Sequence, residues 1–254
     1  MNESPILALL IPVYHEEDNI IPLFNRIADS IKIPVKIYIL YDYDGDPTVG
    51  VVNSIKDSFK FPVVMVKNEM GKGVLNAIKT GFKSFEEEAC VVIMADGSDD
   101  LNTINGMYGL FCQGFHIVCG SRYMRNGDQL GGSWFKKTLS RVAGMSLYFI
   151  THLPTHDVTN SFKLYSKPAL EKIKFESSGG FEIGMEIVVK SFVNRLAITE
   201  VPTTWRDRYE GTSKFKLWSW LPKYFKWYFF LILRDNRLYF KKIPTYNKIR
   251  QVGY

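Results

Sequence analysis

The stretch Cys90-Val-Val-Ile-Met-Ala-Asp96-Gly-Ser-Asp-Asp100 joins a continuous apolar run to a cluster of carboxylates. Such a run is typical of a strand that is buried on both faces of a largely parallel sheet. Open α/β sheets bind ligands at the carboxyl ends of their strands, where this cluster falls. Hard oxygen ligands suit Mg2+ or Mn2+ better than zinc, so Asp96, Ser98 and Asp99 are candidate metal ligands. The alternative is a solvated acidic turn after a core strand.

Composition indicates a globular chain with an anionic partner. Of its 254 residues, 46% are hydrophobic, which is ample for one large α/β domain or two small ones. The formal net charge of +6 favours nucleic acid, a phosphate-bearing substrate or an acidic membrane surface as the partner. Nucleic acid is the least favoured, because the chain has no zinc-finger spacing, no RNP-like aromatic motif and no lysine tail.

Cysteine usage and hydropathy predict a cytoplasmic location. Cys90, Cys112 and Cys119 are odd in number and lack Cys-x-x-Cys spacing, so we expect reduced thiols. The N-terminus has no basic region followed by an apolar stretch, and no run approaches the ~20 apolar residues of a membrane-spanning helix. The oligomeric state stays open, with a homo-oligomer among the alternatives.

Strand and helix patterns alternate along the first half of the chain. Apolar runs predict strands at residues 6–11, 35–40, 63–66 and 90–96, and helical spacing predicts helices at 20–27 and 74–82. This alternation predicts βαβ units and a mostly parallel sheet flanked by helices. Further along we expect a helix at 101–114, a strand at 115–119, a mobile glycine-containing loop at 124–133 and a helix at 134–153.

Several motifs occur in an order that resembles the family 2 glycosyltransferases, and within them the dolichyl/polyprenyl-phosphate sugar synthases. The motifs are Pro12-Val-Tyr-His-Glu-Glu17, Asp42 with Asp46-Pro-Thr48, Gly71-Lys-Gly73, Asp96-Gly-Ser-Asp99, Gly120-Ser-Arg-Tyr123, Asp157-Val-Thr-Asn-Ser-Phe-Lys163, Glu200-Val-Pro202 and the segment from Arg208 to Lys214. The resemblance covers roughly residues 6–216. It implies a GT-A, Rossmann-like domain over 1–216, with a nucleotide-sugar half at 1–100 and an acceptor half at 101–216.

The resemblance also implies roles for individual residues. Those implied to bind the nucleotide sugar are Pro12, Tyr14, Glu16, Asp42, Lys72 and Asp96. Asp96 would also hold the catalytic divalent cation, and the implied cations for the acceptor phosphate are Arg122, Arg208 and Lys214. Two positions depart from the family's pattern, because Tyr41 and Met94 stand where relatives usually have aspartates.

The implied activity is inverting transfer of a sugar from a UDP- or GDP-sugar to a polyprenyl or dolichyl phosphate, for envelope or surface glycan synthesis. One alternative is transfer to a saccharide hydroxyl, which needs a base such as Asp157 or Glu182. Another is a non-catalytic nucleotide-sugar binder, suggested by the aspartates missing at Tyr41 and Met94.

The tail at residues 217–254 is rich in aromatic and basic residues. Helical spacing places apolar side chains on one face, namely Leu221, Phe225, Tyr228, Phe229 and Ile232, while basic residues flank it. This pattern predicts an amphipathic helix in the membrane interface, holding the enzyme peripherally at the cytoplasmic face. The alternatives are a helix that closes the hydrophobic core, or a dimer surface.

Overall fold

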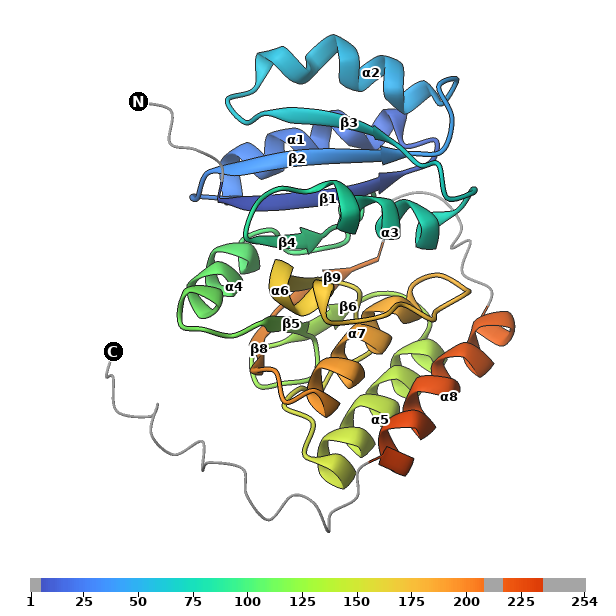
Figure 1. The fold of residues 1–254 in the computed structure, drawn as a ribbon. Helices are drawn as coiled ribbons and strands as arrows, with labels where there is room; N and C mark the ends of the chain where they lie inside the picture. Colours follow the sequence, from blue (N-terminus) through green and yellow to red (C-terminus); the bar gives the residue numbers. More distant parts are fainter. Residues whose placement is uncertain (1–5, 208–216, 235–254) are drawn as a thin grey trace.

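The computed structural model describes residues 6–207 and 217–234, and in this part of the chain a seven-stranded sheet carries helices on both faces (Figure 1). The strand order is β3-β2-β1-β4-β7-β5-β8. The strands are β1 (Leu7–Val13), β2 (Val35–Tyr41), β3 (Val63–Lys67), β4 (Ala89–Val92), β5 (Ile117–Ser121), β7 (Lys163–Ser166) and β8 (Ile198–Pro202). All neighbours pair in parallel except β7, which is antiparallel to both β4 and β5. The predicted α/β class with a mostly parallel sheet is therefore confirmed.

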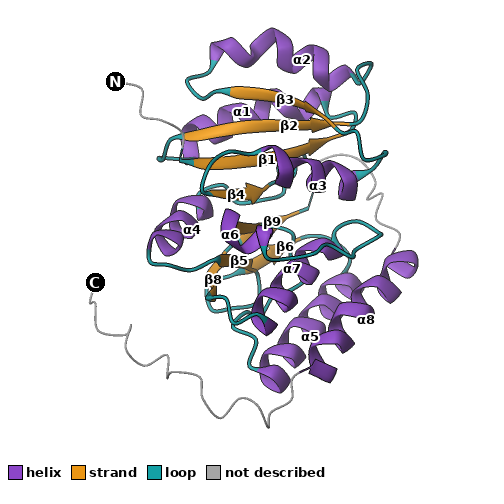
Figure 2. Cartoon of the chain, viewed as in Figure 1, coloured by secondary structure: helices purple, strands orange, loops and turns teal. Residues whose placement is uncertain are grey.

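Short elements and helices connect these strands (Figure 2). Two further strands, β6 (Asp128–Leu130) and β9 (Thr204–Arg206), pair in parallel as a separate small sheet. The helices are α1 (Glu17–Ser30), α2 (Pro47–Ile55), the short 3-10 helix η1 (Lys56–Ser58), α3 (Val74–Ser84), α4 (Thr103–Cys112), α5 (Trp134–Thr151), α6 (Lys167–Glu171), α7 (Glu182–Val193) and α8 (Leu217–Arg234).

The sheet separates two hydrophobic cores, because successive side chains of a strand point to opposite faces. Along β1, Leu7 and Leu9 pack with α1, α2 and α4, whereas Ala8 and Leu10 pack with α3, α5, α6, α7 and α8. All four are wholly buried, which explains why the strand reads as a continuous apolar run.

Two elements differ from the sequence-based predictions. Strand β4 ends at Val92 rather than at Asp96, although the Ile93 N–H still donates to the Leu10 carbonyl of β1 at 3.1 Å. The segment 124–133, predicted as a mobile loop, contains β6, and the side chain of Gln129 on that strand is buried. Pairing of β6 with the distant β9 overrides the local glycine signal.

Helix α8 packs against α5 and α7 instead of standing apart (Figure 1). Trp227 and Leu231 are almost fully buried in the core, so the inner face of the helix closes that core. The predicted apolar face is wrong in part: Ile232 packs partly buried against the core, whereas Phe225 and Phe229 are exposed. Residues 235–254 of the predicted tail lie outside the described residues. No helix within 6–207 and 217–234 is long and apolar enough to cross a bilayer.

Candidate functional site

An aromatic cluster lies at the carboxyl ends of β1 and β2. The Tyr14 ring, half of it exposed, meets the His15 ring edge-on at 4.7 Å between centroids. The Tyr43 hydroxyl lies 2.8 Å from His15 Nε2. His15 has a φ of 55°, in the left-handed region, and its N–H donates to the Asp46 carboxylate at 3.1 Å. Sequence reasoning treated His15 as incidental and did not select Tyr43. Neither the left-handed backbone of His15 nor the contact between His15, after β1, and Tyr43, after β2, can be read from a motif.

The turn after β2 is ordered by helix capping. Asp46 caps α2, accepting from the Thr48 N–H at 2.9 Å, and Pro47 begins the helix. The Glu16 N–H in turn donates to the Thr48 hydroxyl at 2.9 Å. Of the predicted donor-site residues, Pro12 lies in β1, whereas Tyr14 and Glu16 lie on the following turn, which these contacts fasten to α2. The roles predicted for the three are not tested by these contacts.

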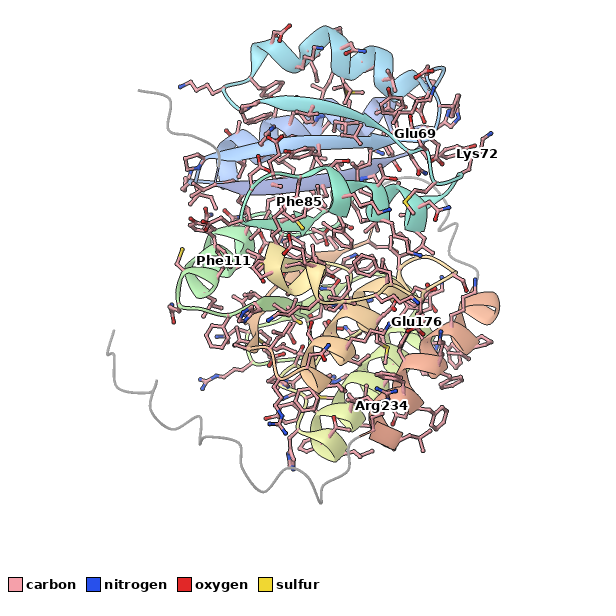
Figure 3. The ribbon with its side chains drawn as sticks, viewed as in Figure 1. Glu69, Lys72, Phe85, Phe111, Glu176 and Arg234 are labelled. Carbon is pink, nitrogen blue, oxygen red and sulfur yellow. The ribbon has the colours of Figure 1, made fainter. Side chains whose placement is uncertain are left out.

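Asp42 fastens the loop between β3 and α3. Its Oδ1 accepts from Asn68 Nδ2 at 2.7 Å, and its Oδ2 accepts from the Gly73 N–H at 2.8 Å. The Gly73 amide is therefore engaged by Asp42 within the chain. Lys72 is exposed, with its Nζ 5.8 Å from the centroid of the Tyr43 ring. Figure 3 shows Lys72 on this loop, extending away from the ribbon.

The Asp96 turn follows β4 and is held from two sides. The Ser98 N–H donates to Asp96 Oδ1 at 3.1 Å, and Gly97 adopts a φ of 72°, which favours glycine. Arg26 of α1 donates to the carbonyls of Gly97 and Asp99, both at 2.7 Å. The Arg206 N–H of β9 donates to the Ser98 carbonyl at 3.0 Å.

The three predicted metal ligands differ in their access to solvent. Asp96 is partly exposed, whereas the side chains of Ser98 and Asp99 are buried. Asp99 Oδ2 accepts from the Met94 N–H at 3.1 Å, and burial raises the pKa of this carboxyl to about 7. In the described part of the chain no group of three or more His, Cys, Asp or Glu side chains could hold a metal ion. A metal here would depend on Asp96 together with oxygens of a bound substrate.

Arg122 and Asp157 form a buried ion pair beyond the end of β5. Nε and Nη2 of Arg122 donate to the two carboxylate oxygens at 2.7 and 2.9 Å. Burial alone would raise the pKa of Asp157, but the charge of Arg122 and the hydrogen bonds that Arg122 donates together outweigh burial and lower that pKa. Nη1 of Arg122 donates to Gln129 Oε1 at 3.3 Å, at the edge of a cavity. The other two predicted acceptor cations, Arg208 and Lys214, lie outside the described residues.

That cavity, of about 470 Å³, lies between α5, α7 and α8. Its polar end is formed by Arg122, Gln129, Thr159, Asn160 and Ser161, and its apolar wall includes Leu139, Val142, Met185, Leu221 and Phe225. Gly144 brings α5 close to the segment that carries Asp157, because a Cβ on this glycine would lie 2.1 Å from the His156 carbonyl oxygen. Sequence reasoning missed the cavity. The apolar and aromatic repeats of α5 and α8 are visible in the sequence, but the packing of the two helices against each other is not.

The two candidate bases for a hydroxyl acceptor are both engaged. Asp157 is wholly buried against Arg122. Glu182, also buried, accepts from the N–H groups of Gly179 and Gly180, both at 2.6 Å. Both carboxylates therefore accept hydrogen bonds from the chain itself, and neither lines the cavity.

Comparisons with known proteins show a family and curated relatives that this chain resembles. The model of the family described as glycosyl transferase family 2 matches residues 8–174. The dolichol-phosphate mannosyltransferase of Pyrococcus furiosus is 28% identical over 83% of this chain, which spans 59% of that protein. The polyprenol monophosphomannose synthase of Mycolicibacterium smegmatis is 25% identical, over 81% of this chain and 79% of that protein.

Solved structures share the fold at low sequence identity. Glucosyl-3-phosphoglycerate synthase from Mycobacterium tuberculosis, in complex with UDP, superimposes with a TM-score of 0.63 at 15% identity, over 96% of this chain and 82% of that one. TarS 1-349 of S. aureus gives 0.58 at 16% identity, over 79% and 60%. The chain therefore has the GT-A fold.

Proposed function

Because the chain belongs to glycosyl transferase family 2, we propose that it is an inverting enzyme that moves a sugar from a UDP- or GDP-sugar to a polyprenyl or dolichyl phosphate. Two curated relatives are named for a lipid-phosphate acceptor and for mannose, which supports this acceptor and makes mannose the first sugar to test. Fold neighbours in complex with UDP and Mn2+ support a nucleotide donor and a divalent cation. We place this activity at the cytoplasmic face of a membrane.

The observation that carries the proposal is the cavity between α5 and α8. An isoprenoid phosphate has a long apolar chain and an anionic head, and it needs a site with the same division. Val142 and Phe225 form apolar wall, whereas Arg122 lies at the polar end. The positive charge of Arg122 is balanced by the Asp157 carboxylate. This arginine would therefore orient the acceptor phosphate mainly through hydrogen bonds rather than through net charge.

On the donor side, the chain offers a cluster for each part of a nucleotide sugar. Tyr14 and Tyr43 present aromatic surface for a base, and Lys72 presents a cation to the diphosphate. Asp96 fits Mg2+ or Mn2+, since those ions are often held by one or two carboxylates plus substrate phosphates. Such an ion neutralises charge that develops on the leaving diphosphate.

The acceptor supplies its own nucleophile. A phosphate monoester has a second pKa of about 6, so it is largely dianionic at neutral pH and needs no general base. The enzyme therefore has to position the phosphate in line with the anomeric carbon. Engagement of Asp157 and Glu182 by other groups is consistent with such a reaction. A single displacement inverts the anomeric configuration.

A non-catalytic nucleotide-sugar binder is the second candidate. It is favoured by the small number of carboxylates available to a metal ion. Asp99 is buried, and Tyr41 and Met94 stand at positions where relatives usually have aspartates.

One assay separates these functions. The full-length protein is incubated with radiolabelled GDP- or UDP-sugars, Mn2+ and either polyprenyl phosphate or a saccharide, and the products are partitioned between water and organic solvent. We expect label in the organic phase only with polyprenyl phosphate. Label transferred to the saccharide would support a hydroxyl acceptor, and nucleotide binding without transfer would support the binder.

A further inference from the structure

Lys163 of β7 is a charged side chain that the proposed mechanism leaves unused. It lies inside the large sheet, where β7 runs between β4 and β5, and it is wholly buried. Lysine is almost never fully buried unless its ammonium is paired. Among the described residues, its Nζ donates one hydrogen bond, to the Val158 carbonyl at 3.2 Å, and forms no salt bridge. Burying an ammonium with so few partners costs free energy of folding, so its presence points to a role beyond stability.

The charge of Lys163 is not cancelled by its neighbours. Burial lowers the pKa of its ammonium. Of the described carboxylates only that of Asp157 opposes this shift, and Asp157 is already held by two hydrogen bonds from Arg122. Cys119 faces Lys163 in the pairing of β5 with β7, and burial raises the pKa of its thiol to about 12, so the thiol stays neutral. Arg122, Lys163 and Asp157 therefore carry two positive charges against one negative charge.

The Lys163 ammonium lies behind the polar end of the cavity. The Val158 carbonyl that accepts from it belongs to the segment 157–161, whose last three residues line the cavity. Gly184 of α7 approaches the same place, since a Cβ there would lie 3.7 Å from the Asn160 carbonyl oxygen and 3.8 Å from Lys163 Nζ. Lys163 itself does not line the cavity. It can therefore act on an anion in the cavity through its charge and not through direct contact.

We propose that Lys163 supplies the net positive charge that attracts the acceptor phosphate to the polar end of the cavity. Arg122 then orients the phosphate through hydrogen bonds, while Lys163 attracts it from behind the segment 157–161. Such an attraction is stronger inside a protein than in water, because the effective dielectric constant is lower. This role of Lys163 rests on the proposed function, which places an anionic head group at that end, and it assigns attraction and orientation to different residues.

Calorimetric titration of the full-length protein with farnesyl phosphate, a short isoprenoid phosphate, measures acceptor binding without a donor. Lys163→Met removes both the charge and the hydrogen bond to Val158, whereas Lys163→Gln removes the charge but keeps an N–H donor. Lys167→Met is the matched control. The Lys167 Nζ also donates to backbone carbonyls, those of Phe85 and Glu86, but it lies just after the other end of β7 and outside the cavity. Urea unfolding of each variant checks the fold.

We expect the dissociation constant for farnesyl phosphate to rise about tenfold in Lys163→Met and in Lys163→Gln alike, and to keep its wild-type value in Lys167→Met. The urea midpoint of Lys163→Met should not fall, because the substitution removes a buried charge that has no carboxylate of its own. Should that midpoint fall, the comparison of Lys163→Gln with the wild type decides, with the same tenfold rise expected.

Two results would overturn the role of Lys163 and leave the proposed function standing. One is wild-type affinity for farnesyl phosphate in Lys163→Met. The other is wild-type affinity in Lys163→Gln alone, which would mean that the hydrogen bond to Val158 matters and the charge does not. If the wild-type protein itself does not bind farnesyl phosphate, that result contradicts the proposed function, and the role of Lys163 with it.

Discussion

Arg122 donates two parallel hydrogen bonds to the carboxylate of Asp157, and the pair is buried at the polar end of the cavity between α5 and α8. The Arg122 backbone N–H also donates to Asp157 Oδ2, at 3.1 Å. The pair therefore joins the end of β5 to the segment before β7 and fixes the orientation of the guanidinium.

Removing one partner of this pair should be costly. Arg122→Met leaves a buried carboxylate without its cation, so we expect a loss of about 3–5 kcal/mol in the free energy of unfolding. Urea unfolding measures this loss. The double variant Arg122→Met/Asp157→Leu should recover part of it, since neither charge of the pair is then left without the other. A single variant within about 1 kcal/mol of the wild type would show that the pair does not hold this region together.

The role of Asp96 can be separated from its part in the fold. Asp96→Asn retains an oxygen that can accept from the Ser98 N–H, so thermal unfolding should stay close to that of the wild type. Transfer should be lost, because the carboxylate that would hold the divalent cation is gone. Activity of the variant within a few-fold of the wild type, or full wild-type activity in excess chelator, would remove the cation from the mechanism.

Asp42 should act on nucleotide binding through the loop that it fastens. Asp42→Ala releases Asn68 and the Gly73 N–H, so we expect weaker binding of the nucleotide even without metal, by about tenfold. Calorimetric titration with GDP and UDP measures it. Asp44→Ala is the matched control, because that exposed carboxylate pairs with Lys67 at the surface. Equal affinities for both variants and the wild type would contradict this role.

Trp227 tests how α8 is held. Its ring is buried, and its Nε1–H donates to the Ser177 hydroxyl at 3.2 Å. Trp227→Ala should reduce the free energy of unfolding by about 3–5 kcal/mol. Phe229 is an exposed neighbour on the same helix, and Phe229→Ala should reduce the free energy of unfolding by no more than about 0.5 kcal/mol. Similar urea midpoints for the two variants would mean that α8 is not part of the core.

The strands were predictable because runs of apolar residues leave a local signature, and this holds even for β3, which lies at the edge of the sheet and is only partly buried. Residues 35–40 and 63–66 read as short apolar runs, and β2 and β3 lie there with ends shifted by one residue. The end of β4 was harder, because Ile93 and Ala95 are apolar too and are buried beneath the Asp96 turn. Both side chains pack in the same hydrophobic core as Leu9 and Ile11 of β1, so burial continues past the last residue of β4.

The candidate site was only partly predictable. Motifs indicated Asp42, Asp96 and Arg122, but not that Asp42 is engaged by Asn68 and Gly73, or Arg122 by Asp157. Those contacts join positions 26 to 35 residues apart, which no local pattern records. The cavity was invisible for the same reason, since Ser146 and Tyr228, which meet beside it, are 82 residues apart.

If a lipid phosphate enters the cavity between α5 and α8, partly filling that cavity should weaken its binding, and steady-state kinetics of Ala143→Phe measure this effect. Ala143 lines the cavity, so the larger ring should fill part of it. The control is Thr138→Phe, which introduces the same ring at an exposed position of α5 outside the cavity. We expect the KM for polyprenyl phosphate to rise about tenfold or more in Ala143→Phe alone, while the KM for the nucleotide sugar stays unchanged. An unchanged KM for polyprenyl phosphate in a folded Ala143→Phe variant would contradict it.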